Sequence, residues 1–538
     1  MKRLTIILLI ISLTASHSFA KKKDLLTIAE SSNYSKTSTS EEVLDFIKEL
    51  KKINSKHLRV ENIAYSEFGK QIPMMMIANP LPKKPEDLKN DPRMVVYIQA
   101  NIHAGEIEGK EASLMLARDL LMDTKNSLFK DLILIIVPNL NPDGNDQMST
   151  RNRTNQNGPP SVGLRHNGQQ LDINRDGLKV ETPELKGLLK NIFNKWDPAL
   201  TIDCHTTNGS YHEEPITFTW MVNPNGDRNL INYMRDKMMP DVAKDLREKY
   251  KVENCYYGNF KNRTKPESGW VYHAAAPRYL TNYIGLRNRF AILNENYVYA
   301  DYKTRVNGCY YFLKTVLEYT AEHKDEMKNA LKKADNISIN RGLKPGKDSF
   351  AIEYKKVPIP YKIKIKAIEA EYVETINGWK RYKPSDRKRE VTITYTADNI
   401  PTKQIKFPCA YILNKYNKEL LENLKDHGIK TEVLKNTQKI RVKEFRFTKI
   451  TPESRHNQGH FRNMIEGSYH EIEKEFPAGS IIIKTSQKLG SLIVNLLEPH
   501  ADDNLVKWNF FDRYITPQWG RRFYPYPVYK VEERGEIK

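Results

Sequence analysis

The chain has 538 residues, of which 39% are hydrophobic and 28% are charged. This amount of apolar material can form large buried cores, which excludes a disordered chain or a coiled coil and predicts two or three domains. Lys and Arg outnumber Asp and Glu by 86 to 66, a formal net charge of +20. The basic residues are interleaved with acidic ones and no nucleic-acid module is recognisable, so we expect a solvated basic surface and no nucleic-acid partner.

The first 20 residues have the features of a secretory signal peptide. Lys2 and Arg3 precede an apolar run from Leu4 to Leu13, and Ser18-Phe19-Ala20 puts small residues before the predicted cleavage site after Ala20. The alternative is a membrane anchor, but this run is shorter than the roughly 20 residues that span a bilayer. The sequence therefore predicts a secreted or periplasmic protein without a stable membrane span.

Exported proteins can hold disulfides, and the chain has four cysteines, Cys204, Cys255, Cys309 and Cys409. Their wide spacing is not that of a zinc ribbon. Four cysteines allow three complete pairings, and the sequence does not choose among them.

The first part of the chain alternates strand-like and helix-like segments. The expected helices cover 41–53, 108–122, 184–196 and 302–334, and the expected strands cover 58–65, 72–77, 94–100, 132–137 and 200–204. This order predicts an α/β domain whose mixed, largely parallel sheet is flanked by helices, with working residues at the strand ends.

The pattern changes near residue 345, where β-rich segments at 361–372 and 391–395 begin. A strand-helix-strand unit follows at 410–413, 418–426 and 431–434, and apolar or aromatic segments follow at 480–484, 489–497 and 508–512. We interpret these last segments as a buried core rather than a second active site. The predicted division is a signal peptide at 1–20, a lead-in segment at 21–54, a first domain at 55–345 and a β-rich α+β domain at 346–538.

The sequence His103-Ala104-Gly105-Glu106 has the spacing of two ligands in a His-x-x-Glu zinc site. The same spacing recurs at 323–326 and 470–473, in charged stretches that suit a solvated surface. The first copy differs because it follows the strand at 94–100 directly, in a glycine-containing loop that leads into a helix. Its side chains should therefore project from one end of the sheet.

A zinc site with an open position needs three protein ligands, commonly two His and one Glu. His205 is the natural third ligand, because it follows the apolar strand at 200–204 and should also lie at a sheet end. The alternative is that His205 is a structural residue.

The sequence Asp172-Ile173-Asn174-Arg175-Asp176 contains an arginine beside an amide. Arg175 and Asn174 could hold a carboxylate through paired hydrogen bonds. The alternative is a surface ion pair between Arg175 and Asp172 or Asp176.

Two further groups could act on a bound substrate. Arg151 and Arg153 offer cations that could stabilise an oxyanion. The apolar strand at 290–295 ends in Glu295, where a general base could be desolvated.

Taken in order, these motifs resemble the zinc carboxypeptidase (carboxypeptidase A-like) family over roughly residues 55–335. The matching set is His103-x-x-Glu106, Asn141-Pro142-Asp143-Gly144, Asp172-x-Asn174-Arg175, His205 and Glu295. The resemblance implies a carboxypeptidase-like fold and one Zn²⁺ per chain, bound by His103, Glu106 and His205. The region after residue 345 resembles the C-terminal region of exported bacterial relatives, which suggests a structural or substrate-restricting role.

The resemblance also implies roles for the remaining residues. Asp172 would orient His103, Asn174 and Arg175 would hold the substrate's terminal carboxylate, Arg153 (or Arg151) would stabilise the oxyanion, and Glu295 would be the catalytic glutamate. The family uses a substrate-clamping tyrosine shortly before that glutamate, and Tyr272, Tyr279 and Tyr283 all compete for this place.

The implied activity is hydrolysis of the C-terminal peptide bond of a peptide or peptide-like substrate with a free carboxylate. One alternative is a zinc amidohydrolase or murein peptide hydrolase that uses the same residues. Another is a non-catalytic binding protein on this scaffold, which the presence of all three ligands and the glutamate disfavours. The sequence leaves open the preferred terminal residue and the oligomeric state.

Overall fold

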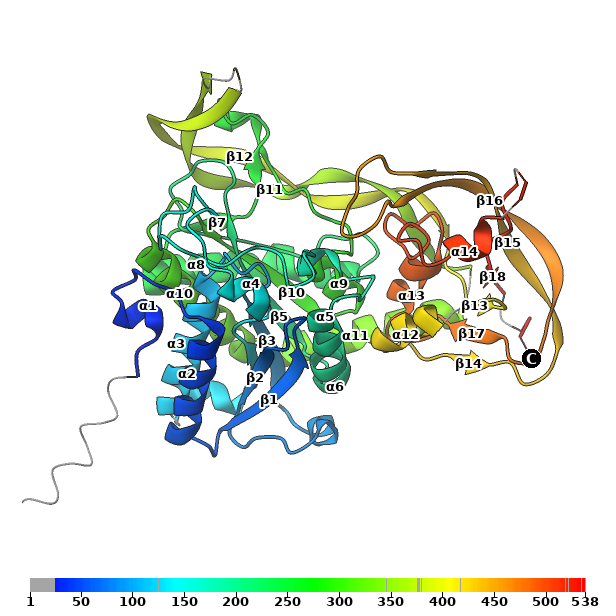
Figure 1. Ribbon diagram of the computed structural model, residues 1–538, viewed down its shortest axis with the longest axis horizontal. Coiled ribbons are helices and arrows are strands. Elements are labelled where there is room, and N and C mark those ends of the chain that lie inside the picture. The colour runs from blue at the N-terminus through cyan, green and yellow to red at the C-terminus, as the bar shows by residue number, and fades with distance from the viewer. Residues whose placement is uncertain are drawn as a thin grey trace, which may run out of the picture.

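The computed structural model describes residues 25–537, except 124, 345, 375–377, 379, 417, 518, 521 and 534. The predicted signal peptide and its cleavage site lie outside the described residues. Figure 1 shows an N-terminal α/β body, a long hairpin that crosses it, and a C-terminal lobe at its side.

The body is built on an eight-stranded sheet in the order β1-β2-β4-β3-β5-β10-β6-β7. Its strands are β1 (Leu58–Tyr65), β2 (Gln71–Ile77), β3 (Met94–Ala100), β4 (Leu132–Val137), β5 (Leu200–Thr207), β6 (Ile216–Trp220), β7 (Asn254–Tyr256) and β10 (Phe290–Tyr297). Four neighbouring pairs are parallel and three are antiparallel. The central strands β3 and β4 are buried along their whole length, as continuous apolar runs in covered parallel sheets are. The predicted mixed, largely parallel α/β sheet is confirmed.

Helices cover both faces of this sheet. They are α1 (Ile28–Ser31), α2 (Ser40–Ile53), α3 (Glu108–Met122), α4 (Pro142–Asp146), α5 (Pro183–Leu188), α6 (Asn194–Trp196), α7 (Arg228–Tyr233), α8 (Met239–Tyr250), α9 (Leu280–Leu286), α10 (Tyr302–Glu322) and α11 (Lys324–Leu343). One apolar core lies under α2, α3, α8 and α10, and a second lies under α5, α6 and α9. The second core continues into the C-terminal lobe, so the two parts of the chain share buried surface.

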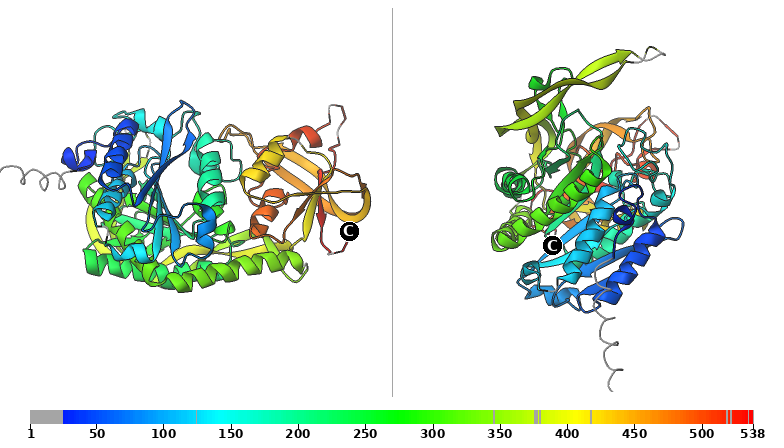
Figure 2. Two further views of the ribbon diagram at one scale, coloured as in Figure 1. Left: turned by 90° about the horizontal axis from the view of Figure 1, so that it is seen from below. Right: turned by 90° about the vertical axis from the view of Figure 1, so that its left-hand side faces the viewer.

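Two predicted helices are interrupted. The helix expected at 302–334 is α10 followed by α11, because His323 adopts non-helical dihedral angles (φ −102°, ψ 15°) between them. The helix expected at 184–196 is α5 and α6 joined by a π-helical turn at Leu189–Phe193. Figure 2 shows α10 and α11 running along the body toward the C-terminal lobe, where Arg341 of α11 donates a hydrogen bond to Ser491.

A second sheet has the order β11-β12-β9-β8. Its strands are β8 (Asn259–Phe260), β9 (Trp270–Val271), β11 (Ser349–Glu374) and β12 (Lys380–Lys406). The long β11–β12 hairpin starts just after the predicted domain boundary, yet Tyr395 of β12 pairs with Trp270 of β9 in the body. The hairpin therefore belongs to the surface of the body as well as to the connection with the lobe.

The C-terminal lobe holds a six-stranded sheet in the order β14-β17-β13-β18-β15-β16, with every pairing antiparallel. Its elements are β13 (Ala410–Leu413), α12 (Lys418–Asp426), β14 (Glu432–Val433), β15 (Gln438–Pro452), β16 (Asn463–Phe476), β17 (Ile481–Lys484), α13 (Gly490–Leu497), α14 (Asp512–Ile515) and β18 (Val528–Val531). Trp508 and Phe511 are fully buried in its core. The prediction of a β-rich C-terminal region is confirmed.

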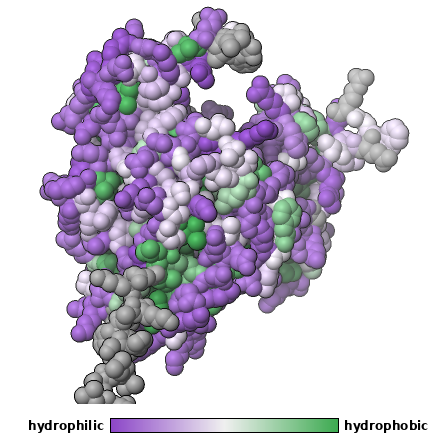
Figure 3. Space-filling view, turned by 60° about the vertical axis from the view of Figure 1, so that its left-hand side comes forward, coloured by the Kyte–Doolittle hydropathy of each residue, from purple (hydrophilic) through white to green (hydrophobic). Residues whose placement is uncertain are grey.

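The surface agrees with the interleaved charges of the sequence. Figure 3 shows a face that is mostly hydrophilic, with small scattered hydrophobic groups. Among the described residues, no helix is both long enough and apolar enough to cross a membrane. Cys204, Cys255 and Cys309 are buried thiols that form no disulfide.

Candidate active site

Three neighbouring parallel strands, β3, β5 and β10, end at the same edge of the main sheet. The loop after β3 carries His103 and Glu106. His205 lies within β5 and pairs in register with Glu295 of β10, and both strands continue for two more residues. The sequence had predicted His205 and Glu295 at the ends of their strands. The register brings all four side chains to one edge of the sheet, where open α/β sheets bind ligands.

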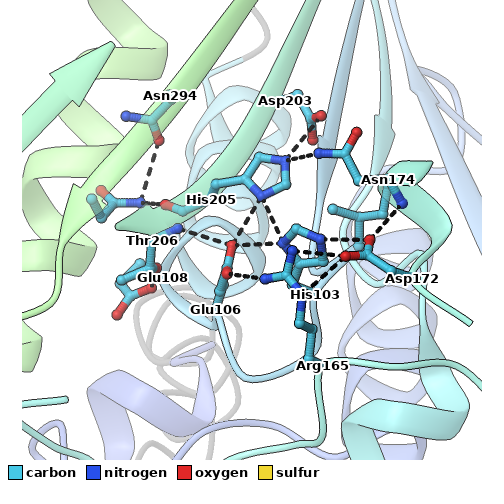
Figure 4. A network of polar contacts seen from close by, with 12 residues as sticks. His103, Glu106, Glu108, Arg165, Asp172, Asn174, Asp203, His205, Thr206 and Asn294 are labelled. Atoms are coloured by element: carbon cyan, nitrogen blue, oxygen red, sulfur yellow. Dashed lines mark hydrogen bonds and ion pairs between the residues drawn. The ribbon is translucent and has the colours of Figure 1, made fainter. Parts of the chain in front are cut away.

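His103, Glu106 and His205 point their donor atoms at one another (Figure 4). The Nδ1 atoms of the two histidines are 3.1 Å apart. Glu106 Oε2 is 2.9 Å from His205 Nδ1 and 3.2 Å from His103 Nδ1. All three side chains are almost fully buried. Two imidazole nitrogens and a carboxylate oxygen therefore form a nearly equilateral triangle.

The opposite nitrogen of each imidazole faces a carboxylate. His103 Nε2 is 2.9 Å from Asp172 Oδ1, and His205 Nε2 is 3.0 Å from Asp203 Oδ2. A carboxylate on Nε2 favours the tautomer that leaves the Nδ1 lone pair available to a metal. Sequence reasoning identified Asp172 but missed Asp203. Asp203 could have been found from its position two residues before His205, because alternate residues of a strand share a face.

The donor set fits zinc. Donors at 2.0–2.1 Å from a tetrahedral zinc ion lie about 3.3 Å from one another, and the three distances here fall slightly below that value. Two histidines and one glutamate are also a common ligand set of catalytic zinc sites. A triangle of three donors leaves one position for substrate or water.

Glu106 also accepts hydrogen bonds from two arginines. Arg153 Nη1 lies 3.0 Å and Arg165 Nη1 lies 3.3 Å from Glu106 Oε1. Burial raises the pKa of Glu106, but His103 and Arg153 lower it well below its usual range. Glu106 is therefore ionised, as a metal ligand must be.

Arg165 had no signal in the sequence, because it lies in a loop without a recognisable motif. Its Nε and Nη2 atoms donate to Asp172 Oδ2 at 3.0 and 2.8 Å. Arg151, by contrast, is exposed and does not line the cavity that holds Arg153 and Arg165.

Glu295 is 8% exposed and lines the same cavity. Burial raises the pKa of this carboxyl to about 8, while His205 opposes the increase. A divalent cation bound nearby would lower this raised pKa toward neutrality.

The cavity has a volume of about 280 Å³ and contains the donor triangle together with Asn174 and Arg175. The guanidinium of Arg175 stacks on Tyr279 at 4.4 Å and donates to the Asn174 carbonyl at 2.8 Å. Its Nη1 is 3.7 Å from Asp172 Oδ2, so the ion pair considered from the sequence is present but long. Asp176 instead accepts backbone and hydroxyl hydrogen bonds from Thr182.

The Asn141–Gly144 motif opens α4 and contacts two loops of the site. Asn141 accepts the Gly144 N–H and donates to the carbonyls of Ile102 and Arg165. A Cβ atom at Gly144 would lie 2.5 Å from two backbone carbonyls. The motif therefore joins the loops that carry His103 and Arg165.

Of the three competing tyrosines, Tyr272 and Tyr279 line the cavity. Tyr283 is fully buried elsewhere, where its hydroxyl contacts His427 Nδ1 at 2.8 Å and Arg287 at 3.1 Å. Only Tyr272 and Tyr279 remain candidates for contact with a substrate.

The C-terminal lobe reaches this site through the turn between β15 and β16, residues 453–462, here called the β15–β16 tip. Gln458 accepts the Asp172 backbone N–H at 2.7 Å. His460 Nε2 lies 2.7 Å from Glu181 Oε1. The tip therefore supports the loop that carries Asp172, Asn174 and Arg175.

Comparison with known proteins agrees with this geometry. The family described as zinc carboxypeptidase matches residues 43–234, a range that includes the donor triangle but not Glu295. Carboxypeptidase 2 of Trichophyton tonsurans is 21% identical over 483 residues, covering 87% of this chain and 81% of that protein. Carboxypeptidase 2 of Trichophyton rubrum is 21% identical over 513 residues, covering 92% and 87%.

Solved structures similar to this chain include a metallo-carboxypeptidase from Burkholderia cenocepacia (15% identity, TM-score 0.40, covering 53% of this chain and 69% of that chain). Another is a metallo-carboxypeptidase from Pseudomonas aeruginosa in complex with (2-guanidinoethylmercapto)succinic acid (17% identity, TM-score 0.39, 54% and 70%). Residues 43–234 therefore match the zinc carboxypeptidase family, and the chain is similar over most of its length to fungal proteins named carboxypeptidase 2.

Proposed function

We propose that the chain is an exported, zinc-dependent metallocarboxypeptidase that hydrolyses the last peptide bond of substrates with a free C-terminal carboxylate. The observation that carries this proposal is the convergence of His103, Glu106 and His205 in a cavity that also contains Arg175. The three donors alone would suit many hydrolases. A cation in the same cavity favours substrates that end in a carboxylate.

His103, Glu106 and His205 would hold one zinc ion per chain, and Asp172 and Asp203 would keep both imidazole rings in orientation. Zinc bound there would polarise the scissile carbonyl and lower the pKa of the attacking water.

Glu295 is the proposed general base. Its carboxylate would accept the proton of the attacking water and then deliver it to the leaving amine. Its burial supports this role, because a desolvated carboxylate holds a pKa close to neutrality and is a stronger base than an exposed one.

Asn174 and Arg175 are proposed to bind the terminal carboxylate. The Tyr279 ring beneath the guanidinium fixes its plane, and a planar guanidinium can donate two parallel hydrogen bonds to a carboxylate. This contact would set the distance between the chain end and the donor triangle.

Arg153 is proposed to stabilise the oxyanion, with Arg165 as a second cation nearby. Both guanidinium groups contact Glu106 and line the cavity. Their charge is preorganised beside the donors, so it requires no rearrangement when negative charge develops on the substrate oxygen.

Export is proposed from residues 1–20 alone, whose pattern is that of a cleaved signal peptide of a secreted or periplasmic protein. We also propose that residues 55–345 form the catalytic domain and that residues 346–538 form an accessory domain. A structural or substrate-restricting role of the accessory domain is supported by the contact of Gln458 with Asp172.

The test is the metal content of the purified mature protein, combined with an assay of amino acids released from peptides, with and without a chelator. We expect chelator-sensitive release from free C-termini only. Glu295→Gln is the matched variant, because it keeps the donor triangle: zinc content should stay the same while release is abolished. Unchanged turnover of this variant would refute the base assignment, and zinc without any release would refute the peptidase.

A further inference from the structure

A second group of metal-type side chains lies outside the proposed active site. It comprises His212, Glu214 and Cys255, whose donor atoms all lie within 4.8 Å of one another. His212 and Glu214 belong to the segment between β5 and β6, and Cys255 belongs to β7. The parallel pairing of β6 with β7 brings Cys255 opposite Thr217, three residues after Glu214.

The donor atoms of His212 and Glu214 are buried and lack partners outside the group. His212 and Glu214 are 3% exposed and Cys255 is 6% exposed. His212 Nδ1 and Glu214 Oε2 face each other at 3.3 Å, and neither has another hydrogen-bond partner among the described residues. Buried polar atoms are rarely left in this state unless an ion, a water or a catalytic role accounts for them.

The two ligand side chains of the loop are held in place by contacts that leave these atoms available. The His212 ring stacks on Tyr297 with ring centroids 3.9 Å apart. Glu214 uses its other oxygen, Oε1, to accept the Lys366 backbone N–H of β11 at 2.7 Å. A metal-binding carboxylate is commonly oriented in this way by a hydrogen bond to its second oxygen.

We propose that His212, Glu214 and Cys255 form a second, structural metal site that takes a divalent cation of the zinc type. The 3.3 Å between His212 Nδ1 and Glu214 Oε2 equals the spacing of about 3.3 Å between two donors of a tetrahedral zinc ion. One nitrogen, one oxygen and one sulfur donor suit a borderline-soft ion such as zinc and disfavour Mg²⁺ or Ca²⁺.

A cavity of about 340 Å³, whose wall includes Glu214 and Cys255, offers a route for the ion and room for a water as the fourth ligand. Burial raises the pKa of Cys255, so the thiol is protonated without a cation and binding releases a proton. The ion would join the loop after β5 to β7, and through Glu214 to the β11–β12 hairpin.

The test is the number of metal equivalents that the full chain retains after saturation with zinc and removal of the excess. The matched variants are Cys255→Ser and Cys309→Ser, the second of which removes another buried thiol. We expect two equivalents in the wild type and in Cys309→Ser, and one in Cys255→Ser. His205→Ala should lose the other equivalent, which separates this site from the one in the proposed function.

Cadmium supplies a direct readout of thiolate ligation through its charge-transfer absorption. The band should appear in the wild type and in Cys309→Ser, and it should be absent in Cys255→Ser. His212→Asn keeps the thiol and should weaken cadmium binding at least tenfold, which decides the matter if Cys255→Ser fails to fold. A single equivalent that only His205→Ala removes, or a cadmium spectrum without a thiolate band, would overturn the inference.

Discussion

Replacing Arg175 by alanine tests the proposed selectivity for a free chain end. Arg175 is partly exposed in the cavity and its nearest anion, Asp172 Oδ2, is 3.7 Å away, so the guanidinium is available to a substrate. Each hydrogen bond to a charged group contributes about 1.5–3 kcal/mol. If two such bonds form and the long contact with Asp172 offsets part of the gain, about 3 kcal/mol is lost in Arg175→Ala. This corresponds to roughly a hundredfold decrease in kcat/KM.

The first assay compares wild type and Arg175→Ala by their kcat/KM for a peptide with a free C-terminus. The second compares their inhibition constants for an N-acylated amino acid and for its amide. In Arg175→Ala the carboxylate inhibitor should weaken roughly a hundredfold while the amide changes little. Arg175→Lys is the matched control, because it keeps the charge but loses the two parallel donors, so its loss should be intermediate. Equal weakening of both inhibitors would refute the carboxylate clamp.

Three further predictions concern ionisable side chains of the body and of the β15–β16 tip. Asp203→Asn should lower zinc affinity roughly 10–100-fold in a competition with a chromogenic chelator, because His205 loses its orienting carboxylate; unchanged affinity would contradict that role. Burial raises the pKa of Glu184 from 4.5 to about 7, so this carboxyl loses its proton less readily in the folded than in the unfolded protein. The free energy of unfolding should therefore fall by about 3 kcal/mol as pH rises through that range. In urea unfolding, Glu184→Gln should not show this fall in stability with pH. If the stabilities of the variant and the wild type changed with pH in parallel, the titration of Glu184 would not be the cause. The hydrogen bond to Glu181 raises the pKa of His460, so its stabilisation should be complete below about pH 6.5 and lost as pH rises through the raised pKa. His460→Gln should therefore be less stable than the wild type at low pH and equally stable at high pH, whereas a constant difference would contradict the titration.

Much of the main sheet could be predicted from the sequence because its strands are continuous apolar runs. The predicted bounds of β1, β3 and β4 agree with the structure. The same runs indicated where His205 and Glu295 lie, since polar residues that follow an apolar run in a parallel sheet lie toward the edge where such sheets bind ligands. The His323 break between α10 and α11 was missed because the apolar periodicity continues across it.

The residues that sequence reasoning missed act through contacts that no local pattern encodes. Asp203 belongs to a strand that reads as apolar, and its role depends on which face His205 presents. Arg165 reaches Glu106 from a loop without a motif. The exclusion of Tyr283 as a substrate contact depends on His427, which is 144 residues away in the chain.

The contact of Gln458 with the Asp172 backbone joins residues separated by 286 positions in the chain. Because a chain is synthesised from its N-terminus and domains tend to fold as they emerge, the body can form before the β15–β16 tip exists. The loop that carries Asn174 and Arg175 would then receive this support only after residues 453–462 have been synthesised. Such a long-range contact closes late and slowly, since the entropy of the intervening loop must be lost first. This order of assembly delays completion of the loop that carries Asn174 and Arg175 until the β15–β16 tip has been made.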